Sequence, residues 1–199
     1  MPRKVQLAAW RVVMPAKNSD LPRTEAHILA ASIESTEPLL LRYAEGFDDV
    51  TAIRQLIGLP NHLLWILGHC GYTMQRVGAF LDGGEVSNAD YRYQQGGGAN
   101  YFAIDAICRD SVPKECAEKY PSLARGREIF SSAISRLANA VRNTSPEQFA
   151  SPVEWHEGPL ELSQLIHRVC FHNACHAGQI VDLRRGFGLP RIIGKSSRD

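Results

Sequence analysis

Four long segments of this chain carry apolar residues at intervals of three and four positions, and this periodicity constrains the fold more than any other feature. Such spacing is typical of helices that bury one face. It predicts helices over about residues 23–44, 60–81, 122–141 and 160–185. The stretches between them are rich in turn-forming residues. We therefore expect a single all-α domain, built as a bundle of helices.

Glycine and proline mark the expected helix ends. Pro22 suits the first turn of the first helix, and Gly46 lies just beyond its end. Gly83 and Gly84 end the second helix. Pro38 lies inside the first window, where a proline removes a backbone hydrogen bond, so a kink or a break is expected there.

The composition of residues 83–120 indicates a long connection rather than a tight turn. It holds five glycines, and residues 103–108 within it can form a short helix. A connection of this length allows the second and third helices to run in the same direction. Residues 96–98 lack the lysine and hydroxyl residue of a phosphate-binding loop, so we interpret them as a flexible linker.

Residues 1–20 are expected to be an extension of the mature protein, with the bundle domain over residues 21–199. Arg3 and Lys4 suit the start of a secretion signal, but Arg11 interrupts the apolar run and no small-residue cleavage site follows. The chain contains no apolar run of the roughly 18 residues that a membrane-spanning helix needs. Five cysteines without a C-x-x-C pair favour reduced thiols, and so a cytoplasmic protein.

The charges are balanced, with 22 Lys and Arg against 21 Asp and Glu and a net charge of +1. Proteins that bind nucleic acids usually present a concentrated basic surface. We therefore expect no nucleic-acid partner, and the lack of a long apolar run predicts no membrane partner. A homodimer is the expected assembly, as it is common for such bundles.

His172 and His176 are the first candidates for chemistry. Four positions along a helix correspond to a rise of about 6 Å and a rotation of about 40°, so two such imidazoles can bind one ion. They interrupt an otherwise apolar stripe formed by Leu165, Val169, Ile180 and Leu183. Buried imidazoles need partners for their nitrogens, and a metal ion would satisfy both at once. Two solvated surface histidines are the alternative.

The remaining histidines of the chain are the candidates for a third ligand. His167 lies about 140° round the helix from His172 and so faces away. His62 and His69 share a face of the second helix but lie about 10 Å apart, too far for one ion to bind both. We prefer His69, in the middle of the helix, over His62, which is expected nearer solvent as an exposed or capping residue. Gln179, one turn beyond His176, could support the site.

Two motifs resemble those of the DinB-like superfamily. The first is Asn-His-Leu-Leu-Trp-Ile-Leu-Gly-His over residues 61–69, and the second is His-Asn-Ala-Cys-His-Ala-Gly-Gln-Ile over residues 172–180. The resemblance extends over about residues 22–190. It implies a four-helix bundle in up-down-down-up order, with His69, His172 and His176 as ligands of a divalent metal.

Three neutral imidazoles leave open positions on a divalent ion, as in catalytic rather than structural sites. Zinc and nickel suit such ligands, and iron is a further candidate. By resemblance, the protein is expected to be a metal-dependent enzyme that activates a low-molecular-weight thiol for transfer to a small electrophile. A metal-dependent hydrolase and a non-catalytic stress-response protein that holds a metal or a ligand are the alternatives.

Cysteines and aromatic residues near these motifs are expected to have structural or pocket-lining roles. Cys70 and Cys175 adjoin two of the proposed ligands, but neighbours on a helix point about 100° apart. We therefore expect them, with Cys170, to be buried apolar residues rather than ligands. Trp155 and His156 precede the last helix, where a loop can line a pocket.

Overall fold

The computed structural model describes residues 24–93, 98, 100–155 and 158–192. The expected extension over residues 1–20, most of the glycine triplet and His156 lie outside this part of the chain. The described residues are mostly helical, as the periodicity predicts. No helix among them is both long enough and apolar enough to cross a membrane.

Four long helices match the four predicted windows to within about three residues at each end. They are α1 (Glu25–Tyr43), α3 (Leu63–Asp82), α5 (Leu123–Arg142) and α7 (Leu162–Gly186). α1 is not broken at Pro38. Three of the four, α1, α3 and α5, begin after a capping residue whose side chain accepts a backbone N–H group; these residues are Thr24, His62 and Ser122.

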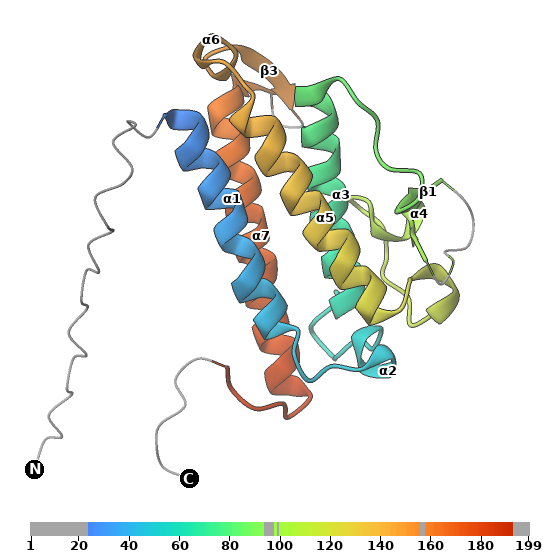
Figure 1. The fold of residues 1–199 in the computed structure, drawn as a ribbon. Helices are drawn as coiled ribbons and strands as arrows, with labels where there is room; N and C mark the ends of the chain where they lie inside the picture. The colour runs from blue at the N-terminus through green and yellow to red at the C-terminus, as the bar shows by residue number, and fades with distance from the viewer. Residues whose placement is uncertain (1–23, 94–97, 99, 156–157, 193–199) are drawn as a thin grey trace, which may run out of the picture.

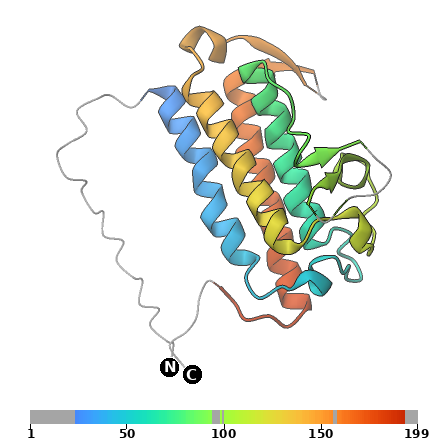
Figure 2. The same cartoon turned by 45° about the vertical axis from the view of Figure 1, so that its right-hand side comes forward.

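The four long helices lie side by side (Figures 1 and 2). α1 packs against α5 and α7, and α3 packs against the same two helices. In Figure 1, α3 and α5 run toward the upper end, and α1 and α7 run the opposite way. α3 is the most buried of the four, and its neighbour α7 lies close enough to share a site with it.

Shorter elements complete the described fold. The helical ones are α2 (Asp49–Ala52), α4 (Ile104–Ile107), the 3-10 turn η1 (Ala117–Lys119) and α6 (Pro146–Phe149). The strands are the parallel pair β1 (Tyr91–Arg92) and β2 (Phe102–Ala103), and the antiparallel hairpin of β3 (Pro152–Trp155) and β4 (Gly158–Glu161). The helical windows did not predict this hairpin, which leads directly into α7.

The connection between α3 and α5 is packed against α3. The side chains of Tyr91 and Phe102 are almost fully buried. Two glycines of α3 make room for them: a Cβ atom on Gly68 would lie 2.7 Å from the ring of Phe102, and one on Gly71 would collide with the hydroxyl of Tyr91. The described part of this segment is therefore ordered structure, and it holds α4 against the middle of α3.

Candidate metal centre

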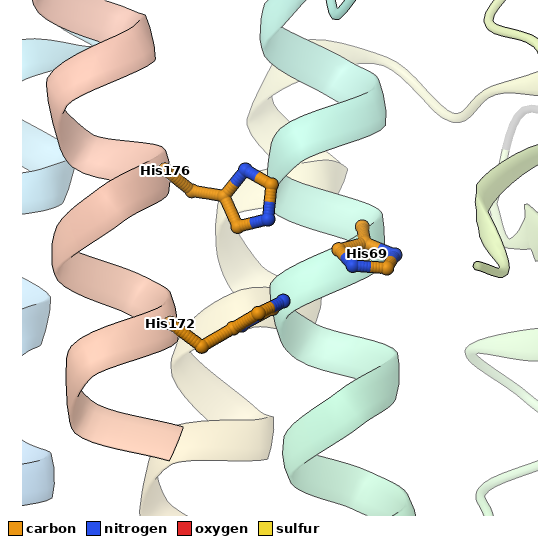
Figure 3. Close-up of side chains that lie close together, drawn as sticks. All are labelled: His69, His172 and His176. Carbon is orange, nitrogen blue, oxygen red and sulfur yellow. The ribbon is translucent and has the colours of Figure 1, made fainter. Parts of the chain in front are cut away.

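The structure brings His69, His172 and His176 together. His69 lies in the middle of α3, and the other two lie one turn apart on α7, with all three rings converging between the helices (Figure 3). One ring nitrogen from each lies within 4.8 Å of those of the other two. The ring centroids are 4.5 Å to 5.1 Å apart. Such spacing allows one ion to contact all three imidazoles.

Burial keeps these imidazoles neutral. It lowers the pKa of His69, and it lowers the pKa of His172 and of His176 to about 4, with repulsion between the neighbouring rings adding to the effect. The ring of Trp65 stacks on His69 at a centroid distance of 4.4 Å and shields that side of the cluster. Neutral imidazoles have a nitrogen lone pair free to bind a metal ion near neutral pH.

Hydrogen bonds decide which nitrogen of His69 is free. Its Nδ1 lies 2.7 Å from the carbonyl oxygen of Ile107 in α4. A carbonyl only accepts, so Nδ1 carries the proton and donates. The lone pair is therefore on Nε2, and the ring orientation is fixed by a backbone group of the connection.

His176 is held in the same way by a side chain. Its Nδ1 lies 3.0 Å from Oε1 of Gln179, one turn further along α7. The amide of Asn61 also donates to this oxygen, at 3.0 Å, which identifies it as the acceptor. His176 therefore donates from Nδ1 and has its lone pair on Nε2. Gln179 therefore orients His176, as the sequence predicted. Asn61, the residue before the N-cap of α3, in turn orients Gln179.

The donor set fits a divalent ion of intermediate softness. Three neutral imidazoles from two helices, one buried and two half-buried, are the arrangement that zinc, nickel and ferrous iron accept, and two of them are fixed through Nδ1. None of the described cysteines or carboxylates joins the cluster. An ion bound here would keep open coordination positions on the side of the cavity.

A cavity of about 840 Å³ adjoins the three histidines. α3 lines it with His69, Tyr72, Thr73 and Arg76, at the three-, four- and seven-residue spacing of one helix face. Further wall residues come from α4 and the residues after it, from β3 and from α7: Ile104, Asp105, Cys108, Arg109, Trp155 and Arg168. The predicted pocket role of Trp155 is thus seen. Tyr72, Thr73 and Arg76 could have been predicted from the sequence, because they lie three, four and seven residues after His69 on the same helix face.

The position of His62 differs from the one that the sequence predicted. Its ring is fully buried rather than near solvent, and its Nδ1 accepts the backbone N–H of Trp65 at 3.1 Å, so it caps α3. It packs edge-on against Tyr120 at 4.6 Å. Burial lowers its pKa to about 4. It therefore has a structural position at the start of α3, outside the cluster.

The cysteines divide between core and surface. Cys70 is buried as expected, Cys170 is half-buried, and Cys175 is exposed, contrary to expectation. Cys108, which the sequence-based reasoning passed over, lines the cavity. His167 is exposed, in agreement with its position on the opposite face of α7.

The family model of the DinB superfamily matches residues 32–180. No curated protein matches the chain. A crystal structure of a conserved protein from Enterococcus faecalis is similar over 80% of this chain and 95% of that one, with a TM-score of 0.62 and 11% sequence identity. At that identity the similarity demonstrates a shared fold alone.

Proposed function

The chain belongs to the DinB superfamily, and from this premise we propose that it is a metal-dependent enzyme that acts on a small molecule. The observation that carries the proposal is the convergence of three neutral imidazoles beside an open cavity. His69, His172 and His176 would hold one divalent ion, with zinc or nickel the first candidates and iron the next. The antiparallel pairing of α3 with α7 fits an up-down-down-up four-helix bundle with this site at its centre.

The reaction we favour is transfer of a low-molecular-weight thiol to an electrophile. A divalent ion in this site would act as a Lewis acid that lowers the pKa of a thiol or of water. The thiol sulfur forms a bond to an electrophilic carbon, the leaving group departs with its electron pair, and the thiol proton passes to solvent. The cavity has room for both reactants.

The residues of the chain would bind and orient the reactants. Trp65 covers one side of His69 and excludes water from it. The hydroxyl of Tyr72 lies in the cavity wall, 2.9 Å from that of Tyr93. Burial raises the pKa of Tyr72, so this hydroxyl keeps its proton at neutral pH and can donate a hydrogen bond to a leaving group.

One observation favours a second candidate, in which the protein holds a metal or a metal-bound ligand without turnover. Asp105 is the acidic residue among the described wall residues, and it forms an ion pair with Lys119 at 3.4 Å. Lys119 thus occupies this carboxylate, and the described wall residues offer no other acidic side chain that could serve as a general base. The same observation disfavours a hydrolase, in which a base commonly activates the water.

The test combines metal analysis with calorimetry. The purified protein is expected to contain or take up one equivalent of zinc or nickel. The loaded protein should then bind a thiol and consume it together with an electrophile such as a chlorinated nitroarene. His172→Ala should lose all of these properties, and His167→Ala on the same helix should keep them. Saturable thiol binding without turnover would support the holding function, and absence of metal binding would refute both.

A further inference from the structure

We propose that the cavity has a subsite for a carboxylate at its mouth, formed around Arg76, so that a ligand of the metal centre carries a negatively charged group at its far end. This inference rests on the proposed function, because it assigns the class of molecule that the site takes. Basic residues outnumber acidic ones in the described part of the cavity wall. Three of the described wall residues are arginines, namely Arg76, Arg109 and Arg168, and one is acidic.

The helix geometry places two of these arginines on the same side of the histidines. Arg76 lies seven residues after His69, about 10 Å along α3, and Arg168 lies four residues before His172, about 6 Å along α7. Since α3 and α7 run in opposite directions, both displacements lead toward the same end of the molecule (Figure 1). The subsite therefore lies about two helical turns or less from the imidazoles.

Two aromatic rings position the guanidinium of Arg76. Its guanidinium carbon lies 5.5 Å from the ring centroid of Trp155 and 5.9 Å from that of Tyr72. Stacking against aromatic faces orients a guanidinium and leaves its N–H edge available. No carboxylate of a described residue forms an ion pair with Arg76. Asp105, the acidic residue among the described wall residues, is paired with Lys119.

The ligand that fits this arrangement has two ends. One end reaches the imidazole cluster, and the other bears a carboxylate, whose two oxygens match the fork of a guanidinium. The carboxylate can belong to the thiol or to the electrophile, and the cavity geometry accepts either. Because Arg76 is exposed, its contribution should be moderate and should fall as salt is added.

Matched probes test the subsite on the zinc-loaded protein. Calorimetry compares 6-mercaptohexanoate with 6-mercaptohexanol, which differ only at the end remote from the sulfur. A second arm compares 4-chloro-3-nitrobenzoate with its amide without added thiol, so that binding is measured in the absence of turnover. We expect the acid to bind about fivefold more tightly than its neutral partner in one of the arms, as for a partly exposed charge pair. The arm that responds identifies which reactant carries the carboxylate.

Variants separate the subsite from general electrostatics. Arg76→Gln should abolish the preference for the acid while leaving zinc affinity unchanged. Arg185→Gln, which removes an exposed charge from the far end of α7, should leave the preference intact. Equal binding of acid and neutral probe by the wild-type protein in both arms, or a preference that survives Arg76→Gln, would overturn the subsite without affecting the proposed metal site.

A metal-independent measurement keeps the two proposals distinct. In the metal-free protein, the Nε–H resonance of Arg76, assigned by its loss in Arg76→Gln, should shift saturably with 6-mercaptohexanoate and not with 6-mercaptohexanol. If zinc fails to bind, the proposed function is wrong, yet this shift would still demonstrate the anion subsite. If neither probe moves the resonance, the subsite is refuted whatever the metal result.

Discussion

The Nδ1 atom of His69 lies 2.7 Å from the carbonyl oxygen of Ile107, a residue 38 positions further along the chain. This hydrogen bond joins the histidine-bearing face of α3, which forms part of the candidate metal centre, to the connection that precedes α5. It gives the connection a role beyond joining two helices, since it fixes the ring that presents Nε2 to the site. Disturbing the packing of the connection should therefore disturb the metal centre.

Gly68→Ala tests this relationship. The added Cβ atom would lie 2.7 Å from the ring of Phe102 and 2.9 Å from Ile107, so the connection must move away from α3. We expect a loss of about 1 to 3 kcal/mol of stability, as for overpacked cores. We also expect weaker zinc binding, because the carbonyl of Ile107 moves with the connection. Urea unfolding of the metal-free protein and competition with a zinc chelator measure the two effects.

Gly178→Ala is the matched control for that substitution. Gly178 is also a helical glycine, but a Cβ atom there meets nothing within 4 Å. Removing a glycine from the middle of a helix should stabilise the protein by about 0.5 to 1 kcal/mol. If both alanine variants behaved alike, the close packing of the connection would have no energetic consequence.

Replacing each histidine of the cluster by alanine should reduce zinc affinity by at least about 100-fold, since two imidazoles alone form an incomplete site. The variants concerned are His69→Ala, His172→Ala and His176→Ala. His167→Ala serves as the control, because His167 is exposed on the opposite face of α7 and should not contribute. Metal analysis after dialysis and chelator competition give the affinities. Retention of full affinity in any one of the three variants would exclude that histidine as a ligand.

Helical periodicity was sufficient to predict α1, α3, α5 and α7, because each buries a stripe that repeats every three or four residues. It also placed His172 and His176 on one face of α7. Periodicity cannot pair a residue of α3 with α7, since that depends on how two helices dock. The choice of His69 came from its position among apolar residues and from the resemblance to a family.

The structural features that the sequence did not predict depend on tertiary contacts. The acceptor for His69 is a backbone carbonyl, and every residue type carries one, so no sequence signal distinguishes Ile107. The hairpin of β3 and β4 is short, and it contains two prolines, which weakens any strand pattern. His62 was expected near solvent because it begins a helix, but Tyr120 covers it.

The burial of His62 predicts a pH dependence of stability. The folded protein holds this imidazole neutral down to a pKa of about 4, whereas the unfolded chain takes up a proton near the ordinary value of 6.5. Between these values the unfolded state binds more protons, so stability falls as the pH falls from 6.5 toward 4. His62→Asn keeps a side-chain acceptor for the cap of α3 and removes the titration.

The measurement for His62 is urea unfolding of both metal-free proteins at several pH values between 4.5 and 7, chosen to span the window in which His62 itself takes up about one proton on unfolding. The free energy of unfolding of the wild type should fall more steeply than that of His62→Asn, by up to about 1.4 kcal/mol per pH unit. All other histidines are common to both proteins, so the difference isolates this residue. Parallel pH profiles would show that His62 is not buried as a neutral group.

Gln179→Leu tests the support of His176. The substitution removes the oxygen that accepts from Nδ1 of His176, while a leucine of similar size keeps the packing of α7. Loss of such a partner typically weakens metal binding by about 10- to 100-fold. The ring can then rotate, and its Nε2 lone pair is less basic and binds a metal ion more weakly. Asn61→Ala should have a smaller effect, since it removes only the group that orients Gln179. Chelator competition should therefore rank zinc affinity as wild type, then Asn61→Ala, then Gln179→Leu, with the free energy of unfolding of the metal-free proteins nearly unchanged. Equal affinity of all three proteins would mean that the orientation of His176 is set by α7 itself rather than by Gln179.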